Sequence, residues 1–259
     1  LFVKKAGNKL FFLSPQKLIL GTNLSISEKV GVVVVGREEN YYVLKFSGGF
    51  KDIFKILEKY GSPPLPPYIK NTGLSERQIR NEYQTVFARN IGSIAAPTAS
   101  LHFTKKLLKS LAKQGVKIKY ITLHVGLGTF APLSEENFKI GRLHSENIRI
   151  SKKTASELNL LKREGYKIIP VGTTSLRALE SAVFGGKLWE FFGNTELFIR
   201  EGYKFKFIDG LITNFHVPKS SLLMLASAIA GRKKILELYR LAMRKKFRFF
   251  SFGDAMFVR

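Results

Sequence analysis

Short apolar runs alternate with turn residues over the first 47 positions. The segments 9–14, 30–36 and 41–46 are rich in β-branched or aromatic side chains and are separated by Gly, Asn and Ser. Runs of this length and composition predict β-strands. Apolar residues then recur at helical spacing and Gly61 supplies a stop, which predicts one helix with the inward face Phe50, Ile53, Phe54 and Leu57.

A proline-rich segment follows at residues 62–71, with the sequence SPPLPPYIKN. Proline fixes φ and lacks an N–H group, so this stretch cannot pair as a central strand. We therefore expect a domain boundary here, with a small all-β domain at residues 1–62 and a larger domain at residues 63–259.

Helical and strand patterns alternate in the larger part, which predicts a mixed α/β fold. Strands are expected at 116–126 and 166–172, and a hairpin at 203–217 around the Asp209–Gly210 turn. Helices are expected between them, with caps at Thr104 and Ser151 and stops at Gly115 and Gly165; their ranges are 104–115, 151–165, 173–182, 220–231 and 232–247.

A glycine motif lies in residues 121–132, ITLHVGLGTFAP, where Gly126, Gly128 and Ala131 match a dinucleotide-binding fingerprint. That fingerprint works only when the glycines open a helix, whose N-terminus meets the pyrophosphate. Pro132 follows at once, and a short helix beginning at Ser134 comes too late. We therefore favour a strand that ends in a tight turn.

Lysine and arginine number 43 against 19 acidic residues, a formal net charge of +24. An excess of this size favours a polyanionic partner, most simply nucleic acid, although a basic proteome or selection for solubility would also produce it.

The chain has no cysteine, which excludes thiolate metal sites, iron–sulfur clusters and a disulfide scaffold, and favours a cytoplasmic protein. The longest apolar run, 222–230, is shorter than the roughly 20 residues that a bilayer needs, so no membrane partner is expected. Because the chain starts at Leu1 and lacks a signal-peptide pattern, we expect that its natural N-terminus is missing.

The four histidines all lie in the larger part, and they are His102, His124, His144 and His216. Their spacing matches no metal motif, so no metal is expected. A single histidine is more often a hydrogen-bonded structural residue than a catalyst. Four of them, each beside turn or hydroxyl residues at the ends of predicted strands, favour a shared cleft.

The segment 171–181, VGTTSLRALES, combines a strand end, a hydroxyl-rich turn and a helix start. Thr173, Thr174 and Ser175 could cap the helix and leave N–H groups facing an anion, which Arg177 in the first turn would also attract. The alternative is ordinary capping with Arg177 turned to solvent.

Several longer motifs carry a family resemblance, in order from about residue 7 to the C-terminus. They are PPLPPYI, YQTVFARNIGSIAAPTASLHFT, HVGLGTFAPL, LHSE, VGTTSLRALES, TNFHVPKSSLLML and FRFFSFGDAM. Together they resemble the S-adenosylmethionine:tRNA ribosyltransferase-isomerases of queuosine biosynthesis.

The resemblance implies an α/β fold with a small inserted β-barrel-like domain. It also implies transfer and isomerisation of the ribosyl moiety of S-adenosylmethionine onto 7-aminomethyl-7-deazaguanine (preQ1) at the wobble position of a tRNA with a GUN anticodon. The products would be epoxyqueuosine, adenine and methionine. A monomeric cytoplasmic enzyme with S-adenosylmethionine as co-substrate and no metal is expected.

This chemistry needs a base at the carbon beside the sulfonium and an acid for the leaving adenine. We expect His102 and His124 to fill these two roles in either order, with His144 and Glu146 as further catalytic candidates. Contacts to cofactor or nucleotide are expected from Thr98, Thr104, Gly126, Gly128, Thr129, Thr173, Thr174, Arg177, Asn214, His216 and Asp254.

The chain departs from the family pattern in three ways. Members of the family carry a substantial N-terminal segment of the α/β domain before the inserted barrel, whereas we expect this chain to begin inside the barrel. Gly141 stands where an earlier histidine is usual before LHSE, and Ser100 replaces a usual glycine, which could narrow its loop.

The segment 232–248 is the leading tRNA footprint, because Lys233, Arg240 and Arg244 would share a helix face opposite Ile235, Leu238 and Leu241. The alternative function is a basic RNA-binding module of the same family without catalysis.

Overall fold

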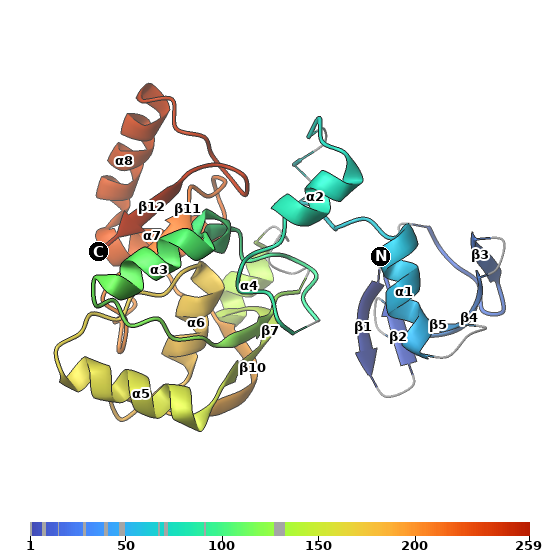
Figure 1. Cartoon of the computed structure of the whole chain (residues 1–259), viewed down its shortest axis with the longest axis horizontal. Coiled ribbons are helices and arrows are strands. Elements are labelled where there is room, and N and C mark those ends of the chain that lie inside the picture. Colours follow the sequence, from blue (N-terminus) through green and yellow to red (C-terminus); the bar gives the residue numbers. More distant parts are fainter. Residues whose placement is uncertain are drawn as a thin grey trace. The chain divides into compact units, whose positions relative to one another are not determined.

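The structure, a computed structural model, describes every residue except 1, 7–8, 15, 28–29, 39–40, 47–49, 67, 70–71, 91 and 127–132. It divides into two compact units. The first unit comprises Leu1–Leu65 and Asn71–Asn81, and the second comprises Pro66–Lys70 and Glu82–Arg259 (Figure 1).

The first unit contains one antiparallel sheet in the order β1-β2-β5-β4-β3. Its strands are β1 Phe2–Ala6, β2 Lys9–Phe12, β3 Asn23–Ser27, β4 Val30–Glu38 and β5 Tyr41–Phe46. Val32, Val34, Tyr42 and Leu44 form its buried core, as alternation along β4 and β5 requires. The three predicted strands are confirmed as β2, β4 and β5, whereas β1 and β3 were not expected. Within the described residues no pairing joins the edge strands β1 and β3 to close a barrel.

Two helices follow that sheet, α1 Phe50–Tyr60 and α2 Glu76–Glu82. The first confirms the predicted helix, although the side chains of 50–54 lie outside the described residues. The second was not expected. It begins with a capping box, in which the amide nitrogen of Ser75 donates to Oε1 of Gln78 at 2.9 Å and Gln78 N donates back to Ser75 Oγ at 3.4 Å.

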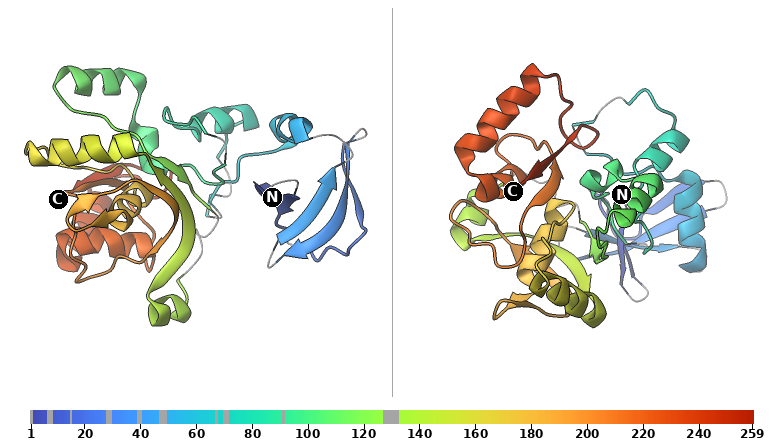
Figure 2. Two further views of the ribbon diagram at one scale, coloured as in Figure 1. Left: turned by 90° about the horizontal axis from the view of Figure 1, so that it is seen from below. Right: turned by 60° about the vertical axis from the view of Figure 1, so that its left-hand side comes forward.

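The second unit is mixed α/β. An antiparallel sheet has the order β10-β7-β6, from β6 Thr122–His124, β7 Arg142–Ile150 and β10 Phe191–Leu197. Figure 2 shows the long twisted ribbon of β7, with α4 Glu135–Ile140 at one end. A second pair joins β11 Leu211–Asn214 to β12 Ala255–Val258, and β8 Val183–Phe184 pairs with β9 Lys187–Leu188.

Helix α6, Thr173–Ser181, lies between α5 Lys152–Arg163 on one side and α7 Ser221–Ala230 on the other (Figures 1 and 2). The main core gathers side chains from these three helices and from the three sheets of the unit, including Leu158, Leu176, Leu225, Ile150, Leu211 and Leu188. A second core lies between α7, β12 and α8 Arg232–Arg244. The unit also contains the 3₁₀ helix η1 Thr98–His102 and α3 Lys105–Lys113.

The local helix signals worked well in this unit. Thr104 and Ser151 cap α3 and α5 by accepting hydrogen bonds from Leu107 N and Thr154 N. Gly115 and Gly165 have φ near +88° and +86° just past the ends of those helices, which is the conformation that glycine tolerates best.

The strand predictions were less accurate. Only Thr122–His124 of the expected strand 116–126 is extended and paired, and Val171 makes a single parallel bridge to Ile212. The hairpin at 203–217 is wrong, because β11 pairs with the C-terminal β12 instead. The amides of Lys206, Phe207 and Ile208 donate to the buried carboxylate of Glu180, so they are not available for a strand ladder.

No helix in the described part of the chain has the length and apolar character needed to cross a membrane. Among those residues there is also no group of three or more His, Cys, Asp or Glu side chains that could hold a metal ion.

Candidate active-site cavity

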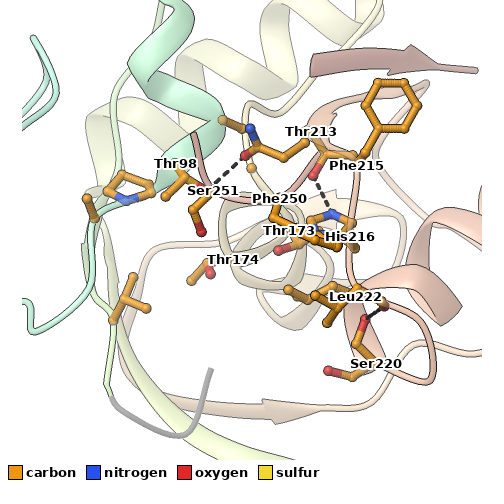
Figure 3. Close-up of a pocket in the computed structure, with 18 of the residues that line it drawn as sticks. Thr98, Thr173, Thr174, Thr213, Phe215, His216, Ser220, Leu222, Phe250 and Ser251 are labelled. Carbon is orange, nitrogen blue, oxygen red and sulfur yellow. Dashed lines mark hydrogen bonds between the residues drawn. The ribbon is translucent and has the colours of Figure 1, made fainter. Parts of the chain in front are cut away.

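A cavity of about 360 Å³ lies in the second unit, where the first turns of α6 and α7 meet η1 and β11 (Figure 3). Its walls come from the segments 96–99, 172–175, 213–222 and 250–251, together with Tyr68, Val125 and Leu133. The cavity therefore unites residues from most of the length of this unit.

Parallel backbone pairing places α6 at this cavity. Gly172 N donates to Ile212 O at 2.8 Å, and Ile212 N donates to Pro170 O at 3.0 Å. The segment 170–172 and β11 consequently end at the same edge, and α6 starts there. Crevices at the carboxyl ends of parallel strands are common ligand sites in α/β proteins.

The N-terminus of α6 carries no side-chain cap. Gly172 occupies the N-cap position with φ +89° and ψ 145°, so the prediction that Thr173, Thr174 and Ser175 cap the helix is wrong. Thr173 and Thr174 are only 7% and 8% exposed, line the cavity, and have no hydrogen-bond partner for their hydroxyls within the described structure. Free N–H groups at a helix N-terminus attract anions and polar acceptors.

Helix α7 also begins at the cavity but is closed. Ser220 Oγ accepts from Leu223 N at 3.2 Å and donates to Val217 O at 2.7 Å. Of these two helix starts, α6 is the one whose first N–H groups are open to a ligand.

A polar trio joins the cavity wall to the first predicted catalytic histidine. Thr98 Oγ1 donates to Asn214 Oδ1 at 2.8 Å, and Asn214 Nδ2 lies 3.4 Å from Nε2 of the exposed His102. Because an amide nitrogen can only donate, Nε2 of His102 is the acceptor in this arrangement.

His216 lines the cavity as a neutral side chain. Its Nε2 lies 2.8 Å from Thr213 Oγ1, and its backbone N donates to the Tyr239 hydroxyl at 2.7 Å. Burial lowers the pKa of His216 to about 4. At neutral pH this imidazole can hydrogen-bond to a ligand but contributes no charge.

His124 ends β6, next to the cavity residue Val125. Its Nδ1 is buried without a hydrogen-bond partner in the described part of the chain, and the ring packs so closely on Gly92 that a Cβ there would lie 2.5 Å from Nδ1. An unpaired buried nitrogen of this kind is unusual, and a catalytic role or a bound water is among its explanations. Gly126 follows on the same strand end, whereas Gly128 and Thr129 lie outside the described residues.

Arg177 and Glu146 form a buried ion pair, with 2.6 Å between Nη1 and Oε2 and exposures of 6% and 3%. The guanidinium also donates to the backbone carbonyls of Leu197, Thr195 and His144. Burial lowers the pKa of Arg177, and the nearby Glu146 carboxylate opposes that shift. Arg177 was expected to contact a substrate anion or to face solvent, and in this structure it instead pairs with Glu146 and does not line the cavity. The expected roles of Arg177 and Glu146 in binding and catalysis stay predictions.

Several other expected site residues do not line the cavity, namely His102, His124, Gly126, His144, Thr104 and Asp254. The imidazole of His144 is exposed on β7, and Thr104 is the N-cap of α3. The carboxylate of Asp254 binds the backbone N and the guanidinium of Arg248 at 2.7 and 2.9 Å, and these bonds together with the charge of Arg248 and His102 lower its pKa. Asp254 thus closes the 248–254 turn beside His102.

Helix α8 presents its predicted cations to solvent, since Lys233, Arg240 and Arg244 are all exposed. Its apolar face differs from the prediction. Ile235 is buried as expected, but Leu238 and Leu241 are 37% and 43% exposed, and Tyr239 and Ala242 are buried in their place.

Sequence reasoning missed the cavity residues Tyr68, Thr213, Lys219, Phe250 and Ser251. The aromatic run 247–252 was a visible signal, but nothing local indicated that one of its rings would reach a cavity.

Comparison with known proteins agrees with this arrangement. The family described as "Queuosine biosynthesis protein" matches residues 2–258. An S-adenosylmethionine:tRNA ribosyltransferase-isomerase from Vesicomyosocius okutanii subsp. Calyptogena okutanii is 46% identical over 239 residues, which cover 92% of this chain and 69% of that protein.

A solved structure is also similar. The crystal structure of S-adenosylmethionine tRNA ribosyltransferase from Thermotoga maritima matches with a TM-score of 0.53 and 31% identity, covering 96% of this chain and 73% of that one. With a family match that spans nearly its whole length, the chain belongs to the queuosine biosynthesis protein family.

Proposed function

We propose that this protein is an S-adenosylmethionine:tRNA ribosyltransferase-isomerase. It transfers and isomerises the ribosyl moiety of S-adenosylmethionine onto preQ1 at the wobble position of tRNA, forming epoxyqueuosine and releasing adenine and methionine. The proposal follows from membership of the family and from the name of the 46% identical relative.

The uncapped N-terminus of α6 is the main structural support for placing the co-substrate in this cavity. Its first N–H groups and the unpartnered hydroxyls of Thr173 and Thr174 suit a carboxylate, such as that of the methionine moiety of S-adenosylmethionine. The neutral His216 adds a hydrogen-bonding group without charge on the same wall. The residues present therefore fit the co-substrate.

S-adenosylmethionine supplies the ribosyl group and a sulfonium that acidifies the neighbouring 5′ carbon. His102 and His124 are our candidates for removing that proton and for protonating the departing adenine. His102 sits beside the cavity residue Asn214, and His124 carries the orphaned buried Nδ1. Either order of the two roles satisfies the need for one base and one acid.

The remaining parts of the proposal concern partners and architecture. The tRNA carries a GUN anticodon with preQ1, the exposed cations of α8 contact its phosphates, and the enzyme is a cytoplasmic monomer. The five-stranded sheet of the first unit corresponds to the inserted barrel-like domain. A non-catalytic RNA-binding role has no observation in its favour.

The test is adenine release. The protein is incubated with S-adenosylmethionine and a preQ1-containing tRNA, with the same tRNA carrying guanine as control, and adenine and modified nucleoside are measured by mass spectrometry. We expect release only with preQ1, and a loss of about 10²- to 10⁴-fold in kcat for His102→Ala and His124→Ala. No release by the wild-type protein contradicts the proposed reaction. Normal rates in both variants contradict the proton-transfer assignment.

A further inference from the structure

Three phenylalanines in the aromatic segment 247–252 contact three different parts of the second unit. Phe249 packs into the second core, with its ring centroid 4.8 Å from that of Phe215. Phe252 meets Tyr83 at 5.5 Å. Phe250 turns to the cavity, where its ring lies 5.5 Å from that of Tyr68 at an angle of 56°. The core contacts of this segment are therefore supplied by the neighbours of Phe250.

The backbone of Phe250 is held in an unfavourable conformation to achieve this. Its φ is +72°, one of three positive values at non-glycine positions in the described structure, with Lys219 and Lys246. Lys246 is explained by helix termination, because its N–H and that of Phe247 bond back to Met243 O and Ala242 O at the end of α8. Phe250 ends no helix, yet a left-handed conformation is unfavourable for an L-residue because Cβ comes too close to the following carbonyl oxygen.

Hydrogen bonds fix this conformation from both sides. Phe250 N donates to Phe215 O at 2.9 Å, and Gly253 N donates to Phe250 O at 3.1 Å. Backbone strain that is retained in this way is found most often at ligand sites. The ring is thus presented to the cavity by a rigid backbone.

Tyr68 is fixed beside it. Its hydroxyl is hydrogen-bonded to the buried Ser251 Oγ, a contact between positions 183 residues apart, while the residue as a whole remains 44% exposed. The two rings form an apolar wall in a cavity that also contains the polar start of α6, with the free hydroxyls of Thr173 and Thr174.

We propose that the Tyr68–Phe250 wall is the subsite for a purine-like base, which stacks on one of these rings. The inference rests on the proposed function, whose substrates offer two such bases, the adenine of S-adenosylmethionine and the 7-deazaguanine of the tRNA. A base suits this wall because it is planar and can stack on an aromatic face while its edge groups hydrogen-bond elsewhere.

Equilibrium binding to the intact protein tests the wall without relying on turnover. The probes are adenosine, S-adenosylmethionine, its uncharged relative S-adenosylhomocysteine, and the free base preQ1, measured by calorimetry. We expect Phe250→Leu to weaken at least one base-containing probe about 5- to 150-fold, the range of base–aromatic stacking. The matched change Phe184→Leu, at a ring that is 81% exposed in β8, should leave every affinity unchanged.

The variant Phe250→Gly separates a binding role from a structural one. Glycine accepts φ +72° without strain, so Tm should stay equal or rise while base affinity falls. A fall in Tm with unchanged base affinity would show that the ring only supports the fold, and would overturn the inference.

The probes also identify the base. If Phe250→Leu loses affinity for adenosine alone, the wall binds the adenine of the co-substrate. If it loses affinity for preQ1 alone, the wall binds the tRNA base. Either result supports the inference. A loss of affinity for S-adenosylmethionine, with unchanged affinity for adenosine and S-adenosylhomocysteine, would mean that the rings contact the sulfonium and would overturn the inference. A wild-type protein that binds none of the probes would also overturn it. Binding of adenosine through Phe250 without adenine release would retain this subsite and remove the proposed reaction.

Discussion

Helices α6 and α8 carry cations of the same type in opposite surroundings. Arg177 of α6 is buried and neutralised by Glu146, with three backbone carbonyls around it. Lys233, Arg240 and Arg244 of α8 face solvent. A buried charge must find its counter-charge inside the protein, whereas exposed cations remain available to a polyanion.

The difference shows that a sequence motif alone does not reveal whether its cation is buried in an ion pair or free to bind a ligand. Arg177 stands in the hydroxyl-rich segment that opens at the cavity, yet it anchors α6 to the sheet at the β10 bulge between Thr195 and Leu197. We therefore predict that its contribution to function is indirect, because it positions the helix whose first turn lines the cavity.

The largest expected effect is from Arg177→Gln. Leaving Glu146 buried without its cation should lower the free energy of unfolding by about 3 to 5 kcal/mol. Urea titration followed by Trp189 fluorescence reports on this unit, since the chain has one tryptophan. The control is Arg142→Gln, whose exposed pair with Glu196 should be worth at most about 1 kcal/mol. Equal losses in both variants would contradict the contrast between buried and exposed cations.

The next effect is a pH dependence at the cavity. The pKa of His216 is about 4 in the folded protein and 6.5 in the unfolded chain, so between these values the unfolded state binds the additional proton. Stability should be complete above pH 6.5 and fall as the pH drops towards 4, by about 3 kcal/mol in total.

The matched variant isolates this contribution. Between pH 4 and 6.5, the slope of unfolding free energy against pH reports the number of protons taken up on unfolding. His216→Gln should lower that number by nearly one, while other acid-sensitive groups keep their contributions. Superimposable slopes for the two proteins would show that His216 is charged when folded.

A smaller effect distinguishes the two faces of α8. Tyr239 points inward and accepts from His216 N, so Tyr239→Phe leaves that amide unpaired. We expect a loss of about 1 to 3 kcal/mol in the free energy of unfolding. If Tyr239→Phe lowers the free energy of unfolding no more than a substitution at an exposed position of α8 does, the hydrogen bond between Tyr239 and His216 does not stabilise the fold.

The smallest effect on stability is expected on the outward face of α8. Replacing Lys233, Arg240 and Arg244 with Gln should change the free energy of unfolding by no more than about 0.5 kcal/mol per position. If these cations contact tRNA phosphates, the slope of log affinity against log salt should flatten by about 2.

A triple Gln variant of the exposed Lys152, Lys153 and Arg163 in α5 provides the charge-matched control. The same flattening in both triples would mean that total charge, and not the α8 face, governs tRNA binding.

The sequence alone determined the features that depend on neighbours along the chain. The caps at Thr104 and Ser151 and the stops at Gly115 and Gly165 lie where they were expected, because capping satisfies backbone groups within one turn. The unexpected helix α2 had a readable signal of the same kind, the Ser75–Gln78 capping box. The family motifs were equally visible in the sequence, and the match over residues 2–258 agrees with them.

Only the tertiary structure decided which polar residues face the cavity and which stabilise the interior. Arg177 reaches Glu146 across 31 positions, and Tyr68 meets Ser251 across 183. The backbone amides of residues 206–208 donate to the carboxylate of Glu180 and form no hairpin. Burial and pairing of this kind depend on how distant segments pack, and hydrophobic period or local propensity carries no information about that packing.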